Sequence, residues 1–137
     1  MSVYTDYQLH PNIFVNPVTA NAKSITTFAQ DFKTIQFSIQ TDASANFDVQ
    51  VIVSNSFLPP DITVAASASN MYNYVGYTDE SNQVYDSSTS PYNPTGTAVN
   101  KTFNVETTGA RWVFFQISNY SAGTLERLDC MLFSNFN

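Results

Sequence analysis

Two apolar-rich runs in residues 109–133, separated by a short polar loop, limit most strongly what this chain can fold into. The runs flank Tyr120–Thr124, whose small residues and single glycine suit a wide turn. Together they predict one long β-hairpin. If Asn119 lies opposite Leu125, alternate residues divide into two faces. A shift of the register by two residues keeps these faces, whereas a shift of one residue would scramble them.

The two faces of this predicted hairpin differ in what they can pack against. One face makes a good core and combines six side chains: Trp112, Phe114, Gln116, Leu128, Cys130 and Leu132. The other face carries Val113, Phe115 and Ile117. It lies beside Met131, Asp129 and Arg127 and is more apolar than a solvated sheet usually is. Because a bare apolar stripe promotes aggregation, a second sheet, the chain's own arm or another subunit must cover Val113, Phe115 and Ile117. Of these alternatives we favour another layer of protein in a larger assembly.

A period of two recurs in the rest of the chain. Ile35, Phe37 and Ile39 alternate with polar residues, and the same pattern repeats from Phe47 to Val53. The intervening polar residues 41–46 predict a second hairpin over Lys33–Ser54. Weaker strand signals occur at Ser24–Gln30, Ile62–Ala66, Tyr72–Tyr77, Gln83–Asp86 and Lys101–Glu106. With no convincing amphipathic helix, residues 23–137 are predicted to form one all-β domain, an antiparallel β-sandwich of jelly-roll-like type.

Residues 1–22 are predicted to be an extended N-terminal arm. Pro11 and Pro17 favour extended backbone around them. Apolar and aromatic side chains are spread along the segment, and an arm seldom buries such groups on itself: Tyr4, Tyr7, Ile13, Phe14 and Val15. Two alternatives stay open at this point: the arm packs along its own sheet, or it reaches a neighbouring subunit.

The segment Asn70–Asn100 is rich in tyrosine. Tyr72, Tyr74, Tyr77 and Tyr92 are candidate interface residues, because tyrosine combines a rigid contact area with a hydroxyl. The same side chains could stack on sugar faces, or they could simply line the edge of the sandwich. Residues 86–96 are predicted to be a long exposed loop.

Charge excludes several classes of partner. Charged residues are only 12% of the chain, the net charge is −6, and the five basic residues are scattered along the sequence. A nucleic-acid backbone and an anionic membrane surface both need clustered positive charge, so neither partner is expected. No signal-peptide pattern and no apolar run of about 18 residues is present, so we expect a protein made in a cytoplasm. A polar but weakly charged composition is typical of extracellular and virion β-proteins.

Residues for catalysis are few. Cys130 is the only cysteine and His10 the only histidine, and they lie far apart in the sequence, so no intrachain disulfide and no histidine–cysteine metal site can form. Asp79–Asn82 with Asp86 lacks the spacing of a helical calcium loop. We therefore expect a protein without catalytic activity, metal or cofactor.

Several segments between about Phe47 and Phe133 resemble a known group of proteins. They are Val51–Ser56, Asn70–Asp79, Gly109–Val113, Asn119 and Ser121–Leu125. The pattern is similar to that of small jelly-roll-like β-sandwich virion proteins of tailed bacteriophages, of the capsid decoration, or cement, type. This resemblance implies a virion location, a homotrimer bound to the major capsid protein, and no catalytic residues.

Three functions follow as hypotheses. A capsid decoration protein would explain the second apolar face, the arm and the low charge. A tail, baseplate or fibre component would explain the same features and would use the tyrosine-rich loop to contact other tail proteins or a receptor. A carbohydrate-binding module would use tyrosines of that loop to stack on a surface glycan.

Overall fold

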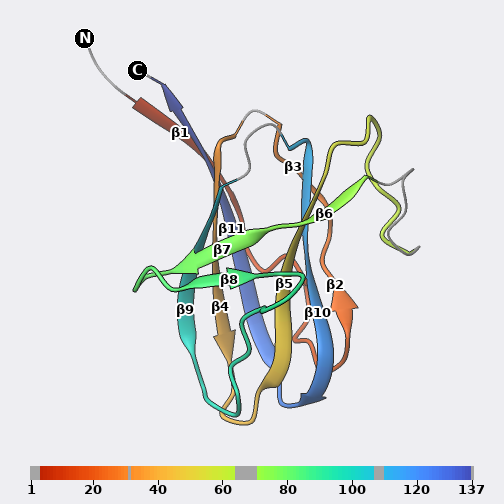
Figure 1. The fold of residues 1–137 in the computed structure, drawn as a ribbon, viewed down its shortest axis with the longest axis vertical. Helices are drawn as coiled ribbons and strands as arrows, with labels where there is room; N and C mark the ends of the chain where they lie inside the picture. Colours follow the sequence, from red (N-terminus) through yellow and green to blue (C-terminus); the bar gives the residue numbers. More distant parts are fainter. Residues whose placement is uncertain (1–3, 31, 64–70, 107–109, 137) are drawn as a thin grey trace.

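Two antiparallel sheets pack face to face in the computed structural model, which describes residues 4–30, 32–63, 71–106 and 110–136 (Figure 1). The six-stranded sheet has, in spatial order, β1 (Tyr4–His10), β11 (Leu125–Phe136), β4 (Thr34–Thr41), β9 (Asn100–Glu106), β7 (Gly76–Asp79) and β8 (Val84–Asp86). The five-stranded sheet has β2 (Ala22–Lys23), β10 (Trp112–Ala122), β5 (Asn46–Ser54) and β6 (Tyr72–Tyr74), with β3 (Thr27–Phe28) also paired to β10. The predicted all-β sandwich is confirmed.

The strongest alternating segments form the two central strands that the sequence predicted. In β4, Ile35, Phe37 and Ile39 are at most 1% exposed, and their polar neighbours lie on the outer face. The inward residues Phe47 and Val49 of β5 are fully buried. Alternation therefore identified both the strands and their buried faces correctly.

Both predicted hairpins are wrong, because in each case the two strands belong to different sheets. β4 and β5 are joined by a β-arch, a connection that carries the chain from one sheet to the other, and so are β10 and β11. The backbone partners come from the other arch: β10 pairs with β5 from Trp112 opposite Ser54, and β11 pairs with β4 as far as Phe133 opposite Thr34. The two strands of one arch thus form their backbone hydrogen bonds with the two strands of the other arch.

This arrangement places Val113, Phe115 and Ile117 in the core of the sandwich, where they are at most 1% exposed. Our expectation that they form an interface with another protein is wrong. In a hairpin, facing residues share one side of one sheet, whereas in an arch the inward side chains of two strands meet across the sandwich. Leu128 and Cys130 therefore belong to the same core from the opposite sheet.

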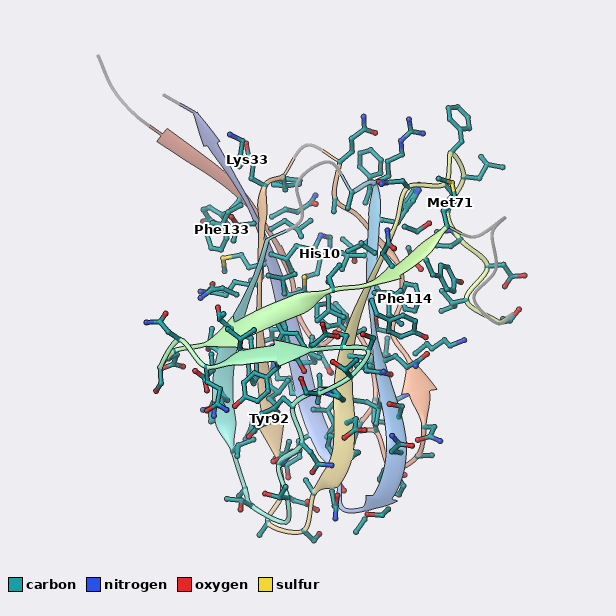
Figure 2. All side chains as sticks on the ribbon, in the orientation of Figure 1. His10, Lys33, Met71, Tyr92, Phe114 and Phe133 are labelled. Atoms are coloured by element: carbon teal, nitrogen blue, oxygen red, sulfur yellow. The ribbon has the colours of Figure 1, made fainter. Side chains whose placement is uncertain are left out.

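The face of β10 that was predicted to be the core is the outer face of the five-stranded sheet. Phe114 (Figure 2) lies on this face but is fully buried. The ring of Tyr72 packs edge-on against it at a centroid distance of 5.3 Å. Trp112 packs edge-on against Phe28 at 5.1 Å. Two short segments of the chain itself thus pack on Phe114 and Trp112, and Phe28 remains partly exposed.

The N-terminal arm packs along its own sheet. β1 pairs with β11 over its whole length, from Tyr4 opposite Phe136 to His10 opposite Cys130. Past β1, the Ile13 N–H donates to the Leu128 carbonyl at 2.9 Å, and Ile13 is 2% exposed. Because β4 pairs with β11 only as far as Phe133, β1 and the end of β11 project together from the body as a two-stranded ribbon (Figure 1).

Candidate interaction surfaces

The candidate interface residues do not form one surface. Six of them are buried: Ile13, Tyr77, Tyr92, Val113, Phe115 and Ile117. Phe14 and Tyr72 are half-buried, and the exposed ones are Tyr7, Val15 and Tyr74, at 67%, 63% and 39%. Tyr4 is placed by its register in β1, opposite Phe136. The exposed members belong to three separate segments, so the set as predicted is not an interface.

Of the four candidate tyrosines in the segment Asn70–Asn100, two belong to the core. Tyr77 donates its hydroxyl to the Val49 carbonyl at 2.5 Å and accepts the Tyr92 N–H at 2.8 Å. The rings of Tyr77 and Tyr92 both pack on Phe103, at 5.3 and 5.0 Å. Burial raises the pKa of Tyr77 far above its ordinary value. These two residues connect the sheets and offer no ring face to a sugar, which corrects their assignment as interface residues.

Asp79 organises the turn between β7 and β8. Its carboxylate is 5% exposed, accepts the N–H groups of Ser81 and Gln83 at 2.9 and 3.0 Å, and forms an ion pair with Lys101 at 3.3 Å. Burial alone would raise the pKa of Asp79, but these hydrogen bonds and the Lys101 ammonium together lower it. The Lys101 ammonium also lies 4.9 Å from the ring centroid of Tyr92. The Asp79 carboxylate thus stabilises the β7–β8 turn and its link to Lys101 of β9.

The first exposed apolar surface lies on β1 and β11. Tyr7 is opposite Phe133 and Leu9 is opposite Met131, and directly opposite residues project on the same side of a sheet. Because the alternate residues of β11 are in the core, these four side chains lie on the outer face. We call the set Tyr7, Leu9, Met131 and Phe133 the β1 corner. Tyr7 and Leu9 are 67% and 51% exposed.

The second exposed apolar surface lies beside the start of β10, and sequence reasoning missed it. Phe57 and Leu58 are 82% and 70% exposed in the loop after β5. The Arg111 guanidinium lies 5.5 Å from the Phe57 ring centroid, and the Trp112 indole N–H donates to the Ser56 carbonyl at 3.0 Å. We call Phe28, Phe57, Leu58, Arg111 and Trp112 the end patch. Two large apolar residues directly before a Pro-Pro pair in a polar loop were the signal that could have revealed it.

A groove of about 510 Å³ runs between β2, β10 and the loop after β5. Its lining includes Ala22, Lys23, Ile62, Thr63, Gln116 and Ser118. Within this lining, the Lys23 ammonium donates to the Ile62 carbonyl at 2.7 Å. The ammonium group is therefore held by the protein itself, and the rest of this lining is apolar or uncharged.

Cys130 and His10, for which the sequence predicts no catalytic role, are respectively buried and in contact with a neighbouring side chain. Cys130 is fully buried, and burial raises the pKa of its thiol to about 12. His10 contacts the Gln8 side chain at 3.0 Å, and partial burial lowers its pKa. Within the described ranges, no three His, Cys, Asp or Glu side chains cluster closely enough to hold a metal ion. No helix long and apolar enough to cross a membrane occurs in the same ranges.

Comparison with known proteins gives a likeness in fold. No family model and no curated protein matches the chain. The solved structure of the SPBc2 prophage-derived protein YomS is similar, with a TM-score of 0.66 over 96% of both chains at 11% identity. The two proteins share a fold. Because the likeness to YomS spans nearly all of both chains, it includes most of the sandwich rather than one sheet.

Two further solved structures have weaker likeness than YomS. The K3 cleaved adhesin domain of Lys-gingipain from Porphyromonas gingivalis W83 has a TM-score of 0.46 and 16% identity, over 83% of this chain and 63% of that one. FLHE has a TM-score of 0.36 and 6% identity, over 98% of both chains. At these scores neither structure informs the function.

Proposed function

We propose that this chain is a non-enzymatic structural protein of a tailed-phage virion, and within that class a capsid decoration protein that stabilises the shell. The observation that carries the proposal is the whole-length fold likeness to the prophage-derived YomS. The sequence resemblance to phage decoration proteins points in the same direction. Its proposed partners are copies of itself and the major capsid protein.

A structural role agrees with how the polar side chains are used. Asp42 joins the two arches by accepting the Thr124 N–H at 3.1 Å, and Asp129 accepts the Asn12 N–H at 2.6 Å. Asp79 holds the β7–β8 turn, and Cys130 lies in the core. These groups stabilise the sandwich and are not gathered around a common cavity.

The end patch is the proposed contact with the shell. It combines exposed aromatic and aliphatic side chains with an arginine, and these residue types dominate the energetics of protein interfaces. Phe57 and Leu58 need no rearrangement to meet a partner, because they already project from their loop. Its charge is a single guanidinium next to apolar groups, a composition that suits a protein surface.

The proposal predicts where the protein is on a particle. Virions produced from the genome that encodes the chain would be purified, labelled with gold-conjugated antibody and analysed by quantitative mass spectrometry. We expect label over the head and a copy number comparable to that of the capsomers. Label confined to the tail would instead support a tail, baseplate or fibre component. Absence from purified virions would contradict both roles.

Variants test the proposed contact directly. Heads lacking the protein would be incubated with the purified wild-type chain or with the double variant Phe57→Asp and Leu58→Asp. We expect the double variant to lose at least about tenfold in binding, because two apolar contacts are replaced by charges. Val84→Asp is the matched control, since Val84 is also 70% exposed but lies at the far edge of the six-stranded sheet. Equal binding by all three proteins would rule out the end patch.

A further inference from the structure

The edge strands of this sandwich differ greatly in length. Across the described parts of the chain, β8 and β6 have three residues each, and β2 and β3 have two each. β1, in contrast, is an edge strand of seven residues. Short edges limit unwanted pairing with other chains, and proline and lysine serve the same purpose. β1 has the sequence YTDYQLH, with neither residue, so it is the edge that is open to another strand.

The side chains around this edge add an apolar contribution. Tyr7 and Leu9 are 67% and 51% exposed on the outer face, and Met131 and Phe133 flank them as half-buried neighbours on β11. Figure 2 shows Phe133 near the place where the ribbon of β1 and β11 leaves the body. A strand added beside β1 would therefore gain backbone hydrogen bonds and apolar contacts together.

We propose that β1 pairs antiparallel with β1 of a second copy of this chain, about a two-fold axis at Gln8. In this register Tyr7 is opposite Leu9 of the second copy, and Asp6 is opposite His10 of the second copy. The pairing joins the two six-stranded sheets into one continuous sheet. The β1 corners of both copies then merge into a single apolar surface. This proposal does not depend on the function proposed above.

A second copy is the occupant because the strand is complementary to itself. A two-fold axis requires that each residue meet a suitable partner in the same short sequence. About Gln8, Tyr7 of each copy lies opposite Leu9 of the other copy, and such cross-strand pairs of an aromatic and an aliphatic side chain are favourable. A two-fold contact of this kind uses the β1 edge of both copies, so the assembly is complete with two subunits. The structure therefore favours a dimer over the homotrimer expected from the sequence resemblance.

The pairing is expected to be weak in solution. Only five residues of each strand overlap in this register. The surface area that they bury should therefore be smaller than the roughly 1,200 Å² that the interfaces of stable complexes bury. We therefore expect a dissociation constant in the micromolar range, so the dimer should increase with concentration. Copies held close together on a surface would pair more completely, because their effective concentration is higher.

The test is analytical ultracentrifugation of the full chain with two matched variants. Wild type should change from monomer to dimer as its concentration rises to about 100 µM. Leu9→Lys should weaken the dimer at least about tenfold, because it places like charges on the joined edge. Val84→Lys puts the same charge on β8, the opposite edge of the same sheet, and should leave the dimer unchanged. Equal melting temperatures would show that both variants are folded.

Several outcomes would overturn the proposal. These are a wild-type monomer at about 100 µM, a trimer, or a dimer that Leu9→Lys does not weaken. A monomer would leave β1 to a strand of a different protein. The register has its own test, because Gln8 lies opposite Gln8 of the second copy. The Cα atoms of directly opposite residues are about 4.5–5.5 Å apart, so Gln8→Cys should form an interchain disulfide under mild oxidation. Cys130 is buried and should not interfere, and a dimer without this disulfide would overturn the register.

Discussion

Gly123 packs its backbone directly against that of Ala45, with no room between them for a side-chain carbon. Gly123 lies in the β10–β11 arch with φ of 81°, and Ala45 lies fully buried in the β4–β5 arch. A Cβ on Gly123 would also lie 2.6 Å from the Ser44 carbonyl carbon. This contact holds the two arches together at the end of the sandwich where the chain changes sheets.

Replacing this glycine should therefore be costly. Gly123→Ala adds a methyl group into backbone that cannot move far and also strains a positive φ, so we expect a loss of about 3 kcal/mol or more in unfolding free energy. The control is Gly96→Ala, where φ is 76° but no atom lies within 4 Å, and the cost should be about 1 kcal/mol. Urea denaturation measures both, and equal losses would contradict the close approach.

The hydroxyl of Tyr77 is expected to contribute to stability. Tyr77→Phe removes a donor to the Val49 carbonyl and an acceptor for the Tyr92 N–H, both in the interior. Leaving these groups with one fewer partner should cost about 1–3 kcal/mol. Tyr74→Phe is the matched control, because Tyr74 is 39% exposed, and it should change stability by less than about 0.5 kcal/mol. Chemical denaturation compares the two, and a neutral Tyr77→Phe would count against the network.

Acid should weaken the sandwich in part through Asp79. The pKa of this carboxyl is lowered in the folded protein, so its stabilisation is present above the ordinary value of 3.8 and is lost as the pH falls through the folded value. Asp79→Asn should therefore be less stable than wild type at neutral pH, and the difference should shrink in acid. Unfolding free energies measured from about pH 7 to pH 2.5 would show this. A difference that does not change with pH would contradict the assignment.

Cys130 should react only when the protein unfolds. The thiol is fully buried, and burial raises its pKa to about 12, so at about pH 8 it is neither accessible nor ionised. An aromatic disulfide reagent should modify the native protein at the rate of unfolding, and denaturant should accelerate the reaction. Fast labelling of a chain whose circular dichroism remains native would contradict the buried position.

The sequence predicted strands better than it predicted their partners. Alternation identified Ile35, Phe37 and Ile39 as inward residues, because the period of side chains is a local property. Whether a short loop joins a hairpin or an arch depends on contacts between distant segments, such as Gly123 against Ala45. For this reason both hairpins were wrong, and with them the face that was expected to bind another protein.

The candidate surface shows the same division. Tyr7, which the sequence analysis named as a candidate interface residue, is exposed. Leu9 was not singled out, because its position beside Met131 depends on a pairing across more than a hundred residues. Phe57 and Leu58 follow a strand that the alternating pattern predicts. Only the folded structure shows that Arg111 and Trp112 lie beside them. The tyrosine content of the segment does not indicate that Tyr77 is buried and Tyr74 exposed.

The position of β11 has a consequence for how the protein acquires its shape during synthesis. β11 is the last strand along the chain, yet it lies between β1, the first, and β4. While a ribosome is still adding residues 125–136, β1 has no partner among the described strands, and β4 has only β9. The larger sheet therefore cannot assemble in the order of translation. Its closure is a late event, and contacts so distant in sequence make folding slow.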